Sequence, residues 1–135
     1  MTYERLIEGY VAHAEAVAHD QPDTHSWAYR GLHALAEEKA DAAWLVVVEV
    51  IKRVADETTL NYVGADILED LLCDHANVLI DRVEALAEAD QHLKDAVRSV
   101  WGWSRMPQEI RARLDRIVGT TKPPEERGRP TSGCS

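Results

Sequence analysis

The 135-residue chain lacks phenylalanine and contains little glycine (7 residues) or proline (5 residues). A sheet-rich domain needs many tight turns, which glycine and proline form readily, so their scarcity argues against such a fold. Alanine, leucine, valine and acidic residues are abundant instead, and this composition favours helices. The length suits one domain with a single hydrophobic core. We therefore expect an all-α fold.

The chain also lacks an uncharged stretch long enough to span a membrane, and its first residues contain no basic region followed by an apolar run. Only two cysteines are present. Cys73 lies in a strongly helical segment and Cys134 in a polar stretch, so we interpret both as free thiols. These features predict a cytoplasmic protein that does not insert in a membrane.

Acidic residues outnumber basic ones by 24 to 15, and they are unevenly distributed. Residues 1–93 hold 6 Lys/Arg and 19 Asp/Glu, a net charge of −13, whereas residues 94–118 hold 6 and 3, a net charge of +3. An acidic field repels the phosphate backbone of nucleic acids. We therefore expect a basic protein partner and no direct binding of nucleic acid.

Apolar residues recur at three- and four-residue intervals, the spacing of one helical face. The pattern predicts about seven helices, at residues 2–18, 24–38, 41–55, 57–74, 76–89, 90–101 and 107–117. The β-branched run at 43–51 would also suit a strand, but the pattern is long enough that we predict a central helix. From residue 119 the chain has no apolar cluster to bury. We expect one domain at residues 1–118 and a flexible tail at 119–135.

A weak internal repeat suggests how the helices are arranged. Residues 27–56 and 62–90 both read as a helix, an acidic turn, a second helix and an Ala-Asp pair, and the pairs at 55–56 and 89–90 are 34 positions apart. This period is typical of helical-hairpin repeats. The prediction is a stack of antiparallel hairpins, HEAT-like or TPR-like, with an irregular helical bundle as the alternative.

Several short motifs resemble a bacterial family known only as a domain of unknown function. They are GADILEDLL at residues 64–72, a histidine at 75, IDRVE at 80–84, VW at 100–101, and WAY and AW at 27–29 and 43–44. Each motif is short, but together they cover most of residues 5–117. The resemblance implies a compact helical domain and no established activity.

Acidic residues in the predicted helices 57–74 and 76–89 fall mainly away from the apolar arcs on a helical wheel. If the two helices are antiparallel neighbours, their acidic faces form one surface, which either only keeps the domain soluble or binds a basic partner. A tryptophan that follows a glycine at a predicted break is a candidate exposed anchor. The candidate partner-binding residues are Asp66, Glu69, Asp70, Asp81, Glu84 and Trp103.

The preferred functional hypothesis is an interaction protein of the immunity, antitoxin or phage-inhibitor type. Zinc-binding, phosphate-loop and nucleophile-elbow motifs are absent, and no catalytic residue, metal or cofactor is predicted. Two alternatives remain open. One is an enzyme or metal-dependent module that uses Glu69, Asp70, His75 and Asp81 in a cleft. The other is a homo-oligomer in which a basic region meets the acidic body of another copy; that region contains Arg105, Arg111, Arg113 and Arg116.

Overall fold

The computed structural model describes residues 3–100 and 106–119. In chain order the elements are α1 (Tyr3–Ala18), α2 (Ser26–Glu38), α3 (Ala40–Arg53), α4 (Glu57–Val63), the π-helical turn η1 (Gly64–Leu68), α5 (Glu69–Ala87), α6 (Gln91–Arg98) and α7 (Gln108–Val118). The described residues are helical and contain no strand. The all-α prediction is confirmed, including the helix over the β-branched run.

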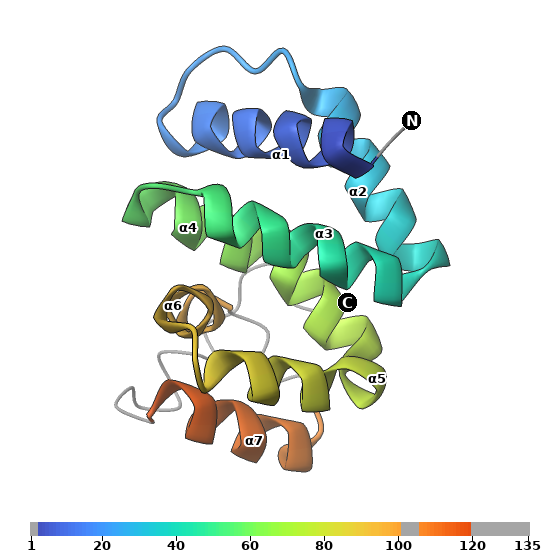
Figure 1. Cartoon of the computed structure of the whole chain (residues 1–135), viewed down its shortest axis with the longest axis vertical. Helices are drawn as coiled ribbons and strands as arrows, with labels where there is room; N and C mark the ends of the chain where they lie inside the picture. The colour runs from blue at the N-terminus through green and yellow to red at the C-terminus, as the bar shows by residue number, and fades with distance from the viewer. Residues whose placement is uncertain (1–2, 101–105, 120–135) are drawn as a thin grey trace.

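Residues 3–100 and 106–119 form six continuous helices rather than about seven, because α4, η1 and α5 follow one another without a break. A helix end was predicted at His75, but there the helix kinks and continues. The backbone of His75 has φ −134° and ψ 22°, outside the helical region, and the helix resumes at the next residue. In Figure 1 the ribbon of α5 changes direction at this point, so that its second part lies beside α7.

The helices are arranged in successive levels. In Figure 1, α1 and the start of α2 lie at one end of the molecule, α3 and α4 lie in the middle, and the second part of α5 lies with α6 and α7 at the other end. The two Ala-Asp pairs of the internal repeat both mark helix starts. Asp56 accepts a hydrogen bond from the backbone N–H of Thr59, and Asp90 accepts one from Leu93, so each caps a helix N-terminus.

The hydrophobic core runs through all of these levels. Trp44, Val47 and Val50 of α3 are buried at its centre, as predicted for the most apolar helix. Gly64, at the start of η1, lies against α6: a Cβ atom there would come within 2.2 Å of the carbonyl oxygen of Ala96. This close approach requires glycine, and it fixes the π-helical turn against α6.

Several predictions fall outside the described residues. Trp103 and Arg105 lie in the gap at 101–105, and residues 120–135 include the predicted tail. Both the boundary of the domain and the flexibility of the tail stay predictions.

Candidate functional site

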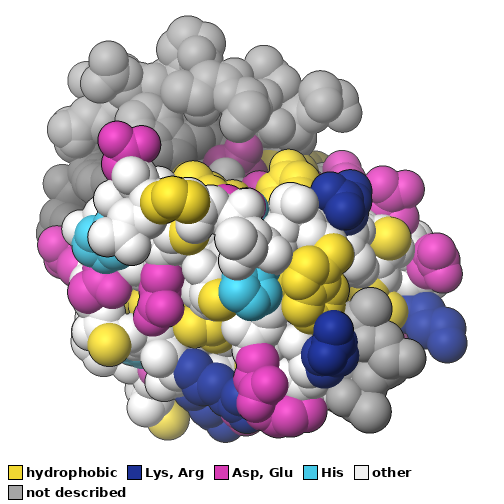
Figure 2. Space-filling view, turned by 90° about the horizontal axis from the view of Figure 1, so that it is seen from above, with side chains coloured by type: hydrophobic (Ala, Val, Ile, Leu, Met, Phe, Trp, Pro, Cys, Tyr) yellow, Lys and Arg dark blue, Asp and Glu magenta, His cyan; other side chains and the backbone are white. Residues whose placement is uncertain are grey.

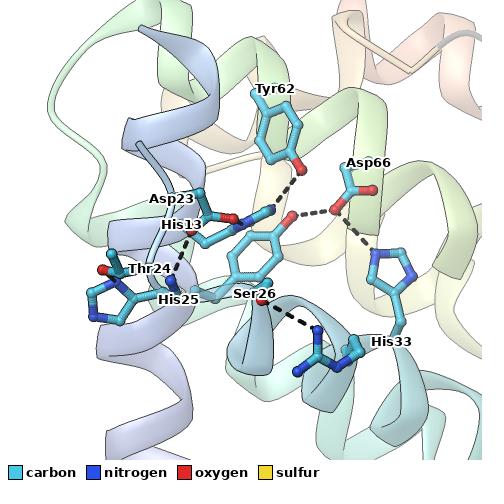
Figure 3. A network of polar contacts seen from close by, with 10 residues as sticks. His13, Asp23, Thr24, His25, Ser26, His33, Tyr62 and Asp66 are labelled. Carbon is cyan, nitrogen blue, oxygen red and sulfur yellow. Dashed lines mark hydrogen bonds and ion pairs between the residues drawn. The ribbon is translucent and has the colours of Figure 1, made fainter. Parts of the chain in front are cut away.

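Histidine and tyrosine side chains link the α1–α2 hairpin to the continuous helix α4–η1–α5 (Figure 3). We call this set of contacts the histidine seam. Its members on the hairpin side are Tyr10, His13, His19 and His33, and its members on the other side are Asp56, Tyr62, Asp66 and Asp70. The three histidines contact three successive stretches of the long helix, from the start of α4 to the start of α5.

Asp66, in the π-helical turn, is the central acceptor of the seam. The hydroxyl of Tyr10 donates a hydrogen bond of 2.5 Å to Asp66 Oδ2, and Nε2 of His33 lies 3.0 Å from the same oxygen. Tyr10 is fully buried. Burial, together with the neighbouring carboxylate, raises the pKa of Tyr10 well above its usual value. Tyr10 therefore stays a neutral donor, and Asp66 carries the negative charge.

His33 bridges two carboxylates. Its Nε2 faces Asp66, and its Nδ1 lies 2.8 Å from Asp70 Oδ2. Only a doubly protonated imidazole can donate from both ring nitrogens. Burial lowers the pKa of His33, but the hydrogen bonds and negative charges of the two carboxylates outweigh burial and raise it to about 9. At neutral pH this group is an imidazolium, which makes it an ion-pair partner and not a general base.

His13 forms a second bridge, with a carboxylate on one side and a phenol on the other. Its Nδ1 lies 2.7 Å from Asp23 Oδ2, and its Nε2 lies 2.7 Å from the hydroxyl of Tyr62. A neutral ring satisfies both contacts by donating from Nδ1 and accepting at Nε2. Burial and the charge of Asp66 raise the pKa of Tyr62, so this carboxylate–imidazole–hydroxyl chain does not generate a nucleophilic phenolate at neutral pH.

Aromatic contacts join the two bridges. The ring of Tyr29 lies 5.0 Å from that of His13 and 4.5 Å from that of His33, measured between centroids. The ring of Tyr10 lies 5.5 Å from that of His13. These separations are within the range of favourable ring pairs. The contacts around His13 and His33 therefore form one connected cluster rather than a set of independent hydrogen bonds.

The third histidine lies at the outer end of the seam. Nε2 of His19 is 2.9 Å from Asp56 Oδ2, and the hydroxyl of Thr59 is 3.3 Å from the same nitrogen. Asp56 also caps α4, and the hydrogen bonds from Thr59 lower the pKa of this carboxyl. An open polar hollow of about 440 Å³ adjoins the pair, lined in part by His19, His25 and Asp56.

The expectation that Asp66 and Glu69 point outward is wrong. Glu69 is 2% exposed, and the side chain of Asp66 is 17% exposed. The helical wheel assumed 3.6 residues per turn throughout, whereas the π-helical turn inserts extra backbone. The insertion rotates the faces that follow it relative to those before it. Asp70, with a side chain 47% exposed, lies partly at the surface.

Asp81 and Glu84 do face outward, but both bind Arg113 of α7. The guanidinium Nε donates a 2.8 Å hydrogen bond to Glu84, and Nη2 donates to Asp81 at 2.5 Å and to Glu84. Arg113 lowers the pKa of Glu84. The predicted acids therefore do not form one wall: Asp66 and Asp70 belong to the seam, and Asp81 and Glu84 pair with α7.

Two residues of the proposed enzyme cleft pair with residues outside it, and a third is buried. Asp70 pairs with His33, Asp81 pairs with Arg113, and Glu69 is buried. Across residues 3–100 and 106–119, no group of three or more His, Cys, Asp or Glu side chains is placed to hold a metal ion. For the oligomer hypothesis, the acids that Arg113 binds come from its own chain.

Cys73, on α5, is disulfide-bonded, so its interpretation as a free thiol is wrong. That interpretation rested on the different settings of the two cysteines, a strongly helical segment and a polar stretch, and such a difference does not exclude a disulfide. Cys134 lies outside the described residues. The thiol argument for a cytoplasmic location is thereby removed, and the location stays a prediction. No described helix is both long enough and apolar enough to cross a membrane.

Most of the chain matches a known protein family. The pattern described as "Family of unknown function (DUF6869)" matches residues 15–121. The chain belongs to this family of unknown function. The match begins late in α1, so it includes His33, Asp66 and Asp70 but not Tyr10 or His13. No curated protein matches the chain, and no solved structure matches it.

Proposed function

We propose that this domain is an acidic protein-interaction module that binds a basic partner protein. The support comes from carboxylates that are exposed and form no ion pair among the described residues. They are Glu15, Asp20, Glu37, Glu38, Glu57, Asp74, Glu88 and Glu109. Their charge is not balanced within the described part of the chain and is available to a partner.

Some of these carboxylates gather beside the seam. Glu37 lies one turn beyond His33 on α2, and Asp74 lies one turn beyond Asp70 on α5. The His33–Asp70 contact joins α2 to the first part of α5. We name this surface, made of Glu37, Glu38, Asp70 and Asp74, the acidic edge.

The acidic edge carries the proposal, because the face seen in Figure 2 has mixed charge. The face above α1 and α2 in Figure 2 carries acidic, basic, histidine and hydrophobic side chains side by side. At the acidic edge, by contrast, the cation in contact is the largely buried His33, which Asp66 shares. A basic surface on a partner would relieve the repulsion among these carboxylates. An immunity, antitoxin or phage-inhibitor role is the finer form of this proposal.

Charge reversal with a matched control tests the proposal. The Glu37→Lys/Asp74→Lys variant changes two charges on the acidic edge, and Glu15→Lys/Glu57→Lys changes two elsewhere. Tagged wild type and both variants are incubated with host proteins at low salt, and the bound proteins are quantified by mass spectrometry. We expect wild type and the control to retain a basic protein. The edge variant should retain about tenfold less of it, and about 1 M salt should elute it from all of them.

Equal retention by the edge variant and the control would contradict the proposal. The proposal would also be contradicted if wild type retained no more basic protein than the edge variant does. Circular dichroism of each variant confirms that the fold is kept, since all four substituted positions are exposed.

A further inference from the structure

The polar contacts of the seam join the α1–α2 hairpin to the helix α4–η1–α5, and each of these contacts involves a histidine or a tyrosine. A further ion pair joins the hairpin to α3, between Glu4 and Arg53. An imidazole gains or loses its charge within an accessible pH range, so a contact between an imidazole and two carboxylates is sensitive to its protonation state.

His33 is the group on which this dependence concentrates. Asp66 from η1 and Asp70 from α5 face its two ring nitrogens, and the ring of Tyr29 from α2 stacks beside it. Tyr10 from α1 reaches the same carboxylate, while the charge of Asp66 also acts on Tyr62 from α4. The two charged groups in contact with His33 are therefore both carboxylates, and the raised pKa values of Tyr10, Tyr29 and Tyr62 keep these side chains neutral.

Loss of one proton from His33 changes an attraction into a repulsion. A neutral ring has one N–H and one lone pair, so one of the two carboxylates would face the lone pair at hydrogen-bonding distance. The side chain of Asp66 is only 17% exposed, so water cannot fully replace the lost bond. Opening the hairpin relieves this contact by giving both carboxylates access to water.

We propose that His33 is a proton-controlled latch: loss of its proton promotes local opening of the α1–α2 hairpin from α4–η1–α5 while α6 and α7 stay folded. The device rests on the seam alone and does not depend on the proposed partner. Its direction follows from the geometry, because the latch is closed when the imidazole is charged and weakened when it is neutral.

Hydrogen exchange with variants at this position tests the latch. His33→Lys keeps a permanent positive charge between Asp66 and Asp70, and His33→Gln carries none. Short deuterium pulses are applied to the full-length chain at about pH 7 and about pH 9.5, and exchange is compared at equal pH so that intrinsic rates cancel. At the higher pH we expect α1 and α2 of wild type to exchange about tenfold faster than in His33→Lys. At the lower pH the two proteins should agree.

The uncharged variant and the distant helices provide the controls. His33→Gln should exchange rapidly in α1 and α2 at both pH values, and α6 and α7 should be alike in all three proteins. Equal exchange of wild type and His33→Lys at the higher pH would overturn the proposal, as would equal acceleration in all helices. If His33→Lys does not fold, the test uses wild type alone. The exchange rate of each helix is divided by its intrinsic rate at the same pH. The proposal then requires that protection of α2 decreases with rising pH more than protection of α7 does.

Discussion

At the scale of single residues, the hydrogen bonds of Asp66 reach far along the chain. It binds Tyr10, 56 positions away, and His33, 33 positions away. A hydrogen bond to a charged acceptor contributes more to stability than one between neutral groups, and a buried group left unpaired is costly. The contacts of this one carboxylate therefore contribute strongly to holding the hairpin in place.

Tyr10→Phe tests the contribution of the shortest of these bonds. The change removes the hydroxyl while keeping the ring, and Asp66 loses one of its two described donors. We expect a loss of about 2 kcal/mol in the free energy of unfolding, measured with urea. Tyr3→Phe is the matched control, because Tyr3 is 47% exposed, and it should change stability by less than about 0.5 kcal/mol. Equal effects of the two substitutions would argue against the Asp66 contact.

The charge of His33 makes global stability depend on pH. Its folded pKa of about 9 lies above the unfolded value of about 6.5. The stabilisation is therefore fully present below about pH 6.5 and is lost as pH rises through about 9. Urea unfolding of wild type should show a decrease of about 1–2 kcal/mol over this window, allowing for solvent contact of the ring.

His33→Gln should remove most of this decrease, because glutamine does not titrate. A wild-type curve that is flat between these pH values, or a variant curve with the same slope as wild type, would contradict the assignment of a charged His33.

Sequence reasoning identified only two of the eight seam residues as site residues. Asp66 and Asp70 were predicted as site residues, but as surface groups. Tyr10 lies on the predicted apolar arc of the first helix, and His13 follows it by three residues, so both face inward. A histidine and a tyrosine on an apolar arc were the sequence features that could have indicated a buried polar contact. Their partners could not be predicted, because the contacts cross 49 and 56 positions of sequence.

At the scale of elements, the π-helical turn and its glycine determine how the middle of the molecule packs. Gly64 lies against the Ala96 carbonyl of α6, and Asp66 follows two residues later. The apolar pattern predicts a helix across this stretch, and a helix is present. The pattern does not distinguish an α-turn from a π-turn, because one extra residue shifts the faces without removing the periodicity.

Gly64→Ala tests the close packing of this turn. The added Cβ would meet a backbone oxygen at 2.2 Å, so α6 or η1 must move, and we expect a loss of about 2–3 kcal/mol. Gly31→Ala is the control. Its Cβ would meet only the flexible end of Leu6 at 3.2 Å, and alanine is the better helix former. Thermal unfolding should give a lowered Tm for the first variant alone. An unchanged Tm for Gly64→Ala would show that α6 does not pack on this glycine.

Helix α7 contains both an exposed ion pair to α5 and a buried leucine, so the contributions of surface charge and core packing can be compared there. Arg113 binds Asp81 and Glu84 at a site open to solvent, with Asp81 83% exposed, and such pairs contribute little. Arg113→Gln should cost at most about 1 kcal/mol, and this cost should shrink in high salt. Leu114→Ala, at a fully buried neighbour, should cost about 3 kcal/mol at any salt concentration. If urea unfolding gave a larger loss in the free energy of unfolding for Arg113→Gln than for Leu114→Ala, the prediction would be wrong.

At the scale of the whole molecule, the sequence predicted the fold class and not the distribution of charge. Hydrophobic periodicity is local, so it located the helices well. Whether acids on two helices share a surface depends on how the helices are rotated and kinked. The kink at His75 and the turn at Gly64 change both. The acids consequently divide between the seam and the α5–α7 contact, while the acidic edge draws on α2, which the sequence did not implicate.

The protonation state of His33 is the most direct test of the account, because the seam, its pH dependence and the latch all require an imidazolium there. It can be observed in the ¹⁵N spectrum of the imidazole ring in the intact protein as a function of pH. We predict that both ring nitrogens carry protons at about pH 7.5, with a midpoint near 9 that falls in the Asp66→Asn variant. A neutral ring at about pH 7.5, with a midpoint near 6.5 that Asp66→Asn leaves unchanged, would contradict the account.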